Sequence, residues 1–279
     1  MQDKVIFLGT AGDEFVTTKQ MRASGGIVIL SEGYQFHLDP GPGSLVQMKK
    51  ALLNPRETTA VLVSHAHINH CNDINAILAG ISKNKLDVRG VLISGNSVIN
   101  GDEKNKPYIT DFHKGCVERI IVPNAGQKIG IQDIEITALK TRHTDTSAIG
   151  FRFDTPKFSL VYSADTAYFA EMVEEYKDTD ILILNVVSPF DKRDGQNLNS
   201  DDAVNIIKRV KPKVTIITHF GKEMMEANPI YQARELSKIT ESSVIAAEDG
   251  AVIDPSNYAS KTRQKKLESF ETEIKENIE

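Results

Sequence analysis

The sequence lacks the features that are typical of proteins in an oxidising compartment or in a membrane. It has two cysteines, Cys71 and Cys116, which are too few for a disulfide framework and favour a reducing compartment. It shows no secretory signal and no apolar run near the ~18 residues that a membrane span requires. We therefore expect a cytoplasmic protein with no membrane contact.

A net positive charge is also lacking. The formal charge of −5 at pH 7 argues against broad electrostatic attraction to nucleic acid, which usually shows as a basic domain or stripe. No Gly-x-Ser-x-Gly string is present, so the sequence shows no serine nucleophile elbow. Residues 41–44 lack the glycine and lysine spacing of a nucleotide loop, and they predict a tight turn with a serine cap at a helix start.

Apolar residues are plentiful enough for a sizeable core, at 40% of the chain, with 25% charged. Strands are predicted over residues 4–8, 26–30, 35–38, 60–64, 91–94, 134–139, 149–153, 158–163, 181–184, 214–218 and 244–247. Helices are predicted over residues 44–53, 70–81, 169–176, 201–210 and 229–239. Strands dominate the first half and mix with helices in the second, which favours an α/β fold of two sheets packed face to face under outer helices.

No repeat or low-complexity linker divides the chain, so we predict a single domain over residues 1–260. The stretch 261–279 is highly charged and carries four apolar residues on one helical face: Leu267, Phe270, Ile274 and Ile278. It is predicted to be an amphipathic helix, either frayed or docked on the body or on a partner subunit.

Five of the seven histidines fall at spacings typical of metal sites, and the densest cluster is residues 65–70, His-Ala-His-Ile-Asn-His, directly after the apolar run 60–63. Histidines two apart in an extended segment point the same way, about 7 Å apart along the backbone. His65 and His67 can therefore bind one ion, while His70 turns toward a second. The cluster predicts a metal site.

Other residues of metal-binding type follow predicted strands one at a time: Asp39, His143, Asp165 and His219. At such positions a rigid sheet presents ligands to a shared cleft, so we expect these side chains to converge on the histidine cluster. Cys71, beside His70, is either a further ligand or a small buried residue.

In their order along residues 39–219, these segments resemble the metallo-β-lactamase superfamily, whose pattern runs from an Asp through His-x-His-x-Asp-His to a lone His, a lone Asp and a final His. Residues 8–12, 22–24, 163–166 and 247–250 resemble the ribonuclease Z and phosphodiesterase branch of that superfamily. The resemblance implies a four-layer αβ/βα sandwich of two mixed β-sheets flanked by helices, with the metals at one edge between the sheets.

The resemblance also implies the ligands. His65, His67 and His143 would hold a first ion, His70 and His219 a second, and the catalytic carboxylate Asp165 would bridge both. Asp39 would orient a ligand histidine by accepting its ring N–H. The expected metal is Zn or Mn, with one or two ions per chain.

Asn69 departs from the family pattern, which usually has Asp at this metal-binding and catalytic position. Its neutral carbonyl oxygen is a weaker ligand and cannot act as a base, so we expect a weaker second metal site. Asp73, one helical turn further on, either compensates as a supporting carboxylate or caps the helix start. A deliberate Asp-to-Asn replacement would give the same sequence.

Four weaker candidates concern the substrate. His37 and His113 are either acids that protonate a leaving oxygen or ordinary structural residues. Arg22 and Lys222 are candidate phosphate-binding residues.

We therefore expect a metal-dependent hydrolase that uses metal-activated hydroxide on phosphodiester bonds, of RNA or of a small or cyclic diester. Hydrolysis of another ester or a thioester is one alternative, and a metal-binding pseudoenzyme weakened by Asn69 is another. A mononuclear iron redox enzyme is a third, although His70 and His219 argue against it. The family resemblance favours a homodimer.

Overall fold

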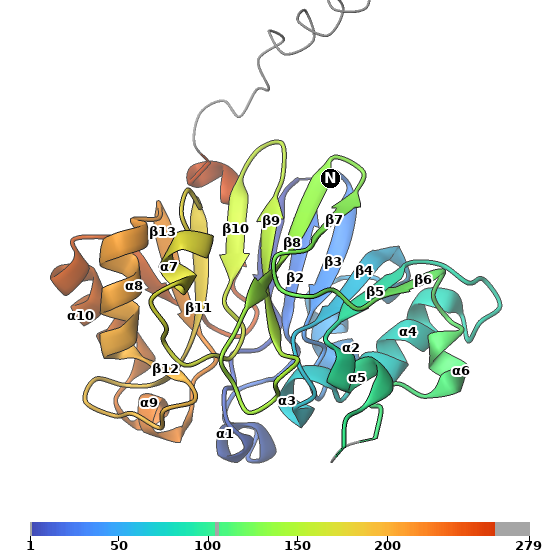
Figure 1. Cartoon of the computed structure of the whole chain (residues 1–279), viewed down its shortest axis with the longest axis horizontal. Helices are drawn as coiled ribbons and strands as arrows, with labels where there is room; N and C mark the ends of the chain where they lie inside the picture. The colour runs from blue at the N-terminus through green and yellow to red at the C-terminus, as the bar shows by residue number, and fades with distance from the viewer. Residues whose placement is uncertain (1, 104–105, 260–279) are drawn as a thin grey trace, which may run out of the picture.

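The computed structural model describes residues 2–103 and 106–259 and shows two mixed β-sheets packed face to face, with helices on both outer faces (Figure 1). The first sheet has the strand order β15-β1-β2-β3-β4-β5-β6. The second has the order β14-β13-β11-β10-β9-β8-β7, and β12 pairs with β11. This architecture confirms the predicted α/β sandwich.

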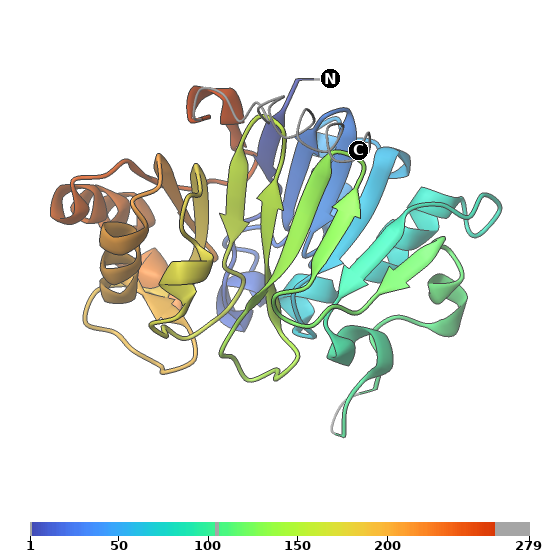
Figure 2. The ribbon, with the colours of Figure 1, turned by 45° about the horizontal axis from the view of Figure 1, so that its top comes forward.

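The strands of the first sheet are β1 Lys4–Phe7, β2 Ile27–Ser31, β3 Tyr34–Leu38, β4 Thr58–Val63, β5 Val91–Ser94, β6 Arg119–Ile121 and β15 Val252–Ile253. Those of the second are β7 Lys128–Ile131, β8 Ile134–Lys140, β9 Ile149–Asp154, β10 Ser159–Tyr162, β11 Ile181–Ser188, β12 Leu198–Asn199, β13 Val214–Thr218 and β14 Val244–Ala246. Figure 2 shows the two sheets from a second direction.

The helices are α1 Glu14–Thr18, α2 Ser44–Lys50, α3 Ile68–Cys71, α4 Ile74–Ser82, α5 Asn96–Asn100, α6 Asp111–Lys114, α7 Met172–Glu175, α8 Ser200–Val210, α9 Lys222–Glu226 and α10 Pro229–Thr240, with short 3-10 turns at Pro55–Glu57 and Pro255–Asn257. Helices α2, α4, α5 and α6 lie on the side of the first sheet, and α7, α8 and α10 on the side of the second (Figure 1). In the described part of the chain, no helix has both the length and the apolar character needed to cross a membrane.

Strands β10, β11 and β13 of the second sheet are buried on both faces, whereas β8 is buried on one face only. In β11, Ile181 and Ile183 face the core between the sheets, whereas Leu182 and Leu184 pack under the outer helices. Such a strand reads as a continuous apolar run, because side chains alternate between two buried faces. This packing explains why the run was recognisable in the sequence.

The helix predicted over residues 70–81 is two helices, α3 and α4, separated at Asn72 and Asp73. The backbone N–H of Asp73 donates to the Pro40 carbonyl at 2.9 Å, and its carboxylate accepts from the Gly43 N–H at 2.9 Å. These tertiary bonds turn the chain away from continuous helical geometry. Strands β6, β7, β12 and β15 were not predicted, and the predicted helix at 261–279 lies outside the described residues.

Candidate metal centre

The predicted ligands lie at one edge of the sandwich, because the strands that precede them run in the same direction within each sheet. Strands β3 and β4 are parallel, so Asp39 and the segment 64–67 follow strand ends at the same edge. In the second sheet His143 follows β8, Asp165 follows β10 and His219 follows β13. The centre is therefore assembled from both sheets.

Two groups of donor atoms form there. His65, His67, His143 and Asp165 make the first group, and His70, Asp165 and His219 make the second; within each group the donor atoms all lie within 4.8 Å of one another. Asp165 belongs to both groups. The structure thus brings together the six residues to which the family resemblance assigned the ions.

In the first group the ring nitrogens lie close to one another. His65 Nε2 lies 2.9 Å from His67 Nδ1, which lies 3.3 Å from His143 Nε2. Asp165 Oδ2 is 3.9 Å from His65 Nε2. The carbonyl of Gln196 lies 3.1 Å from His143 Nδ1 and can accept its N–H, which leaves Nε2 free to act as a ligand.

In the second group one carboxylate oxygen faces two imidazoles. Asp165 Oδ2 lies 3.2 Å from His70 Nε2 and 3.1 Å from His219 Nε2. The other oxygen, Oδ1, accepts from the amide of Asn185 at 2.7 Å. Burial would raise the pKa of Asp165, but the neighbouring charges of His219 and His70 hold that pKa well below its usual range. The carboxylate is therefore ionised, as a metal ligand must be.

Asp39 supports the second group by binding the ring nitrogen of His70 that does not face Asp165. It accepts from His70 Nδ1 at 2.9 Å, from the Tyr162 hydroxyl at 2.7 Å and from the Ser64 backbone N–H at 2.7 Å. The bond to Nδ1 fixes the ring orientation and leaves Nε2 facing Asp165, the role that the resemblance implied for Asp39.

The protonation of the imidazoles differs between the groups. Burial lowers the pKa values of His65 and His67, which keeps these rings in the neutral, metal-binding form. Burial would also lower the pKa of His70, but the carboxylates of Asp165 and Asp39 raise it to about 10. A cation in the second group must therefore displace a proton from His70.

Asn69 lies at the second group and is 8% exposed. Its amide nitrogen donates to the Gly12 carbonyl at 3.0 Å and lies 3.3 Å from His219 Nε2. Gly12 also approaches the backbone of His219 so closely that a Cβ would lie 2.0 Å from the His219 carbonyl oxygen. The asparagine is thus part of a closely packed hydrogen-bonded contact.

Asp73, His37 and His113 are not brought into the centre. Asp73 bonds to the Gly43 N–H, as described above, so it does not compensate for Asn69. His37 points away from the core between the sheets and bonds to the Gly25 carbonyl at 2.8 Å, and burial lowers its pKa to about 4. His113 lies within α6, and its Nδ1 is 2.7 Å from the hydroxyl of Thr110, the residue that caps the start of that helix. Neither histidine can protonate a substrate from these positions.

Arg22 and Lys222 lie near the centre but are not ligands. The Arg22 guanidinium is 5.9 Å from the ring centroid of Phe220, which follows His219. The Lys222 ammonium is 5.2 Å from the Phe15 ring and 3.8 Å from Glu226. Cys71 is buried, its thiol donates to the His67 carbonyl, and burial raises its pKa, so it is not a ligand in this arrangement.

Sequence reasoning gave no role to several supporting residues. The Asp145 carboxylate accepts from the Ala66 N–H at 3.0 Å, from the Ser147 N–H at 2.9 Å and from the Ser97 hydroxyl, and so joins the two loops of the first group. Burial would raise its pKa, but these hydrogen bonds lower it. Its place two residues after His143 was the only sequence signal.

Three residues at the metal centre have a left-handed backbone conformation: Asp39, which supports a ligand, Ala164, which precedes one, and the ligand His219. Their φ angles are 50° at Asp39, 53° at Ala164 and 64° at His219. Side chains other than glycine rarely adopt this conformation, which costs about 1–3 kcal/mol at each position. The surrounding hydrogen bonds hold the turns that direct Asp39, Asp165 and His219 inward.

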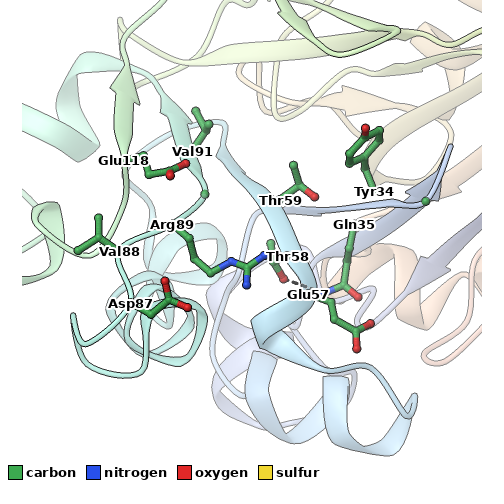
Figure 3. A pocket seen from close by; sticks show the side chains of 12 residues that line it. Tyr34, Gln35, Glu57, Thr58, Thr59, Asp87, Val88, Arg89, Val91 and Glu118 are labelled. Atoms are coloured by element: carbon green, nitrogen blue, oxygen red, sulfur yellow. Dashed lines mark hydrogen bonds between the residues drawn. The ribbon is translucent and has the colours of Figure 1, made fainter.

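Two pockets of about 680 and 530 Å³ flank the loop of residues 141–146 beside the first group. Another of about 650 Å³ is lined by residues at the starts of β3, β4 and β5, among them Tyr34, Thr58 and Val91 (Figure 3). Because the ligands follow the ends of β3 and β4, the pocket of Figure 3 lies at the opposite edge of the sheet and takes no part in the centre.

Comparisons with known proteins agree with this fold. The model of the β-lactamase superfamily domain matches residues 34–220. An uncharacterized protein of Methanocaldococcus jannaschii is 31% identical over 256 residues, covering 91% of this chain and 96% of that protein. The zinc phosphodiesterase ELAC protein 2 homolog of Caenorhabditis elegans is 24% identical over 276 residues, covering 78% of this chain and 32% of that protein.

Among solved structures, the metallo-β-lactamase fold protein YhfI from Bacillus subtilis superposes with a TM-score of 0.75 at 21% identity, covering 91% of this chain and 99% of that one. The molecule is therefore an α/β sandwich with the metallo-β-lactamase fold. The chain belongs to the β-lactamase superfamily. Membership and the His/Asp groups together imply binding of divalent metal and support a metal-dependent hydrolase.

Proposed function

We propose that this protein hydrolyses phosphodiester bonds with one or two zinc or manganese ions held by the two donor groups. The observation that carries the proposal is the shared Asp165 Oδ2, which faces the histidines of both groups. A bound dication would supply Lewis acidity and lower the pKa of water from about 15.7 to about 7. The name of the Caenorhabditis elegans relative, a zinc phosphodiesterase, supports this substrate class. The segments 8–12, 22–24, 163–166 and 247–250 support the ribonuclease Z branch.

The chain's own residues prepare the centre for this chemistry. Asp39 orients His70, and Asn185 binds Oδ1 of Asp165 so that Oδ2 faces His70 and His219. Asn69 offers a neutral carbonyl and cannot take a proton from water, so the ionised Asp165 is the carboxylate closest to the reaction. Asp165 would be the carboxylate available to both cations, so a second ion would bind more weakly than the first.

A metal-binding protein without turnover is the second candidate, and Asn69 favours it. The amide is hydrogen-bonded to Gly12 and is not a base, so the centre has no carboxylate at this position. Hydrolysis of a thioester or of another ester would use the same ions. The metal centre therefore does not distinguish these substrates from phosphodiesters, and the substrate pocket would have to do so. The complete second group disfavours a mononuclear iron redox enzyme.

The test is hydrolysis of bis(p-nitrophenyl) phosphate with added zinc or manganese. We expect metal-dependent turnover by the protein with Asn69, a gain in Asn69→Asp and a loss of at least about 100-fold in His143→Ala. Metal analysis should give one or two Zn or Mn per chain. If the natural chain and Asn69→Asp both bind metal but release no nitrophenol, the protein is not a diesterase; one iron with oxygen uptake would support the redox alternative.

A further inference from the structure

The two pockets beside the first metal group differ in charge. The larger, which we call the Arg142 pocket, is lined in part by Arg142, Tyr168 and Gln196. The smaller lies on the other side of the 141–146 loop and is lined in part by His67 and Glu103. A substrate held at the metals therefore meets a guanidinium on one side and a carboxylate on the other.

We propose that the Arg142 pocket binds the nucleoside part of a short phosphodiester, with Arg142 paired to the phosphate and the Tyr168 ring stacked on the base. This inference rests on the proposed function, because it places the scissile phosphate at the metals. It narrows the substrate class to diesters that carry a nucleoside on one side.

The backbone fixes Arg142 between two ligands. Its N–H donates to the Thr166 hydroxyl at 2.9 Å, and its carbonyl accepts from the Ala167 N–H at 2.7 Å. The next residue is His143, and Thr166 follows Asp165. The backbone of Arg142 is thus held between the two loops that carry His143 and Asp165, and its side chain starts from a fixed point beside these ligands.

The guanidinium is oriented but remains available to an anion. Its central carbon lies 4.9 Å from the ring centroid of the buried Phe169. Its ion pair with Glu171 is 3.7 Å long, and both side chains are more than half exposed, at 53% and 65%. An exposed pair of this kind is weak and can be exchanged for a phosphate, which arginine binds through two parallel hydrogen bonds.

Asp145, a carboxylate that lines the Arg142 pocket, does not repel a bound anion strongly. Asp145 directs its oxygens to the Ala66 and Ser147 N–H groups and to the Ser97 hydroxyl. The smaller pocket, in contrast, carries the carboxylate of Glu103. An anionic substrate therefore extends into the Arg142 pocket, where the charge is more favourable.

The shape and lining of the Arg142 pocket suit a nucleoside. Its volume of about 680 Å³ lies within the range of small-molecule sites. The Tyr168 hydroxyl accepts from Arg209 at 3.0 Å, which holds the ring in place, and stacking on an aromatic ring is the common way to bind a base without sequence preference. Gln196 and Thr146 supply hydrogen-bonding groups for a sugar, whereas the hydroxyls of Thr141 and Thr144 already bond to the Ala148 carbonyl and to His67 Nε2.

Binding of thymidine monophosphate and of methyl phosphate to the zinc-loaded protein, measured by calorimetry, tests the assignment without turnover. We expect thymidine monophosphate to bind at least about 10-fold tighter than methyl phosphate, and Tyr168→Leu to remove most of that difference.

Arg142→Gln should weaken binding of the nucleotide about 10-fold, and Arg142→Lys should restore part of it. The matched control Glu103→Gln should stay within about twofold of the natural protein. Equal binding of the two ligands, or an equal loss in Glu103→Gln and Arg142→Gln, would overturn the inference.

Turnover separates this inference from the proposed function. The rates on thymidine p-nitrophenyl phosphate and methyl p-nitrophenyl phosphate are compared in the natural protein and in Tyr168→Leu. Hydrolysis of both diesters with a ratio that Tyr168→Leu leaves unchanged would reject the Arg142 pocket and keep the diesterase. Nucleotide binding that depends on Arg142, without hydrolysis of either diester, would keep the pocket and reject the diesterase.

Discussion

The amide of Asn69 satisfies the Gly12 carbonyl at 3.0 Å, in a contact where water has little access. Removal of the amide leaves that acceptor without its partner. We therefore predict that Asn69→Ala lowers the free energy of unfolding of the metal-free protein by about 1–3 kcal/mol. Urea unfolding measures this change, and Asn205→Ala on the exposed side of α8 serves as the control, with an effect below about 0.5 kcal/mol. An equal effect of the two substitutions would contradict the assigned hydrogen bond.

His37 gives the protein a specific dependence on pH. Burial lowers the pKa of this histidine from 6.5 to about 4, so between these values the unfolded chain binds a proton that the folded chain does not. Stability is therefore present above pH 6.5 and is lost as the pH falls, with a contribution of about 2 kcal/mol lost by about pH 5.

We predict that His37→Gln unfolds more easily at pH 7.5, because the packing changes, but loses less stability than the natural protein on transfer to pH 5. The measurement is urea unfolding of both proteins at the two pH values without metal. If both lose the same free energy, His37 is not the group that titrates.

At the scale of secondary structure elements, the two loops of the first group are joined by Asp145. Its bond to the Ala66 N–H sets the distance between the loop after β4 and the loop after β8. We predict that Asp145→Asn weakens zinc binding by about 10-fold, because supporting partners of ligands usually have effects of this size. Competition with a chromophoric chelator measures the affinity. Asp133→Asn, in the exposed turn between β7 and β8, is the control, and a comparable loss there would refute the role of Asp145.

The sequence predicted the long apolar strands well, because burial on both faces or on alternate residues leaves a recognisable pattern. Strands β5 and β13 have the predicted bounds. Strands β12 and β15 are two residues long, and β7 reads Lys-Ile-Gly-Ile, so tertiary pairing rather than local pattern makes these segments strands. The break between α3 and α4 likewise depends on bonds to residues 40 and 43, which no local pattern reveals.

The same distinction applies to the centre. The six ligand-type residues were found because their types and their places after strands are unusual together. Tyr162 and Asn185 were missed, since a tyrosine and an asparagine in apolar strands give no sign that they bond to Asp39 and Asp165. The structure decides for the structural alternative at His37, which the sequence left open because a strand position does not tell which face is turned toward the cleft.

For the whole molecule, the donor groups combine residues from both sheets, so a bound ion links the two halves of the sandwich. We predict that zinc at 100 times its dissociation constant stabilises the protein by about 2.7 kcal/mol, and that a chelator reverses this. Thermal unfolding with and without metal measures the effect, and His143→Ala should reduce it. A melting temperature that does not depend on metal would show that the donor groups bind no ion in the folded state.

Other predictions at this scale are still expectations from the sequence. They are the homodimer, the cytoplasmic location and the single domain over residues 1–260 followed by a charged helix at 261–279. Light scattering of the full chain measures the oligomeric state directly, and a molecular mass near the 30.9 kDa of one chain would exclude the dimer.

The left-handed residues at Asp39, Ala164 and His219 bear on how this protein responds to engineering. Together they place unfavourable backbone strain at the edge where the ligands meet, and favourable interactions in the rest of the sandwich offset this strain. Selection for heat resistance would favour substitutions that relax these turns, and such variants would tend to lose the arrangement of their donors. At this edge, substitutions that raise thermal stability should therefore lower activity. Substitutions at the opposite edge, around the pocket of Figure 3, should be able to raise stability without lowering activity.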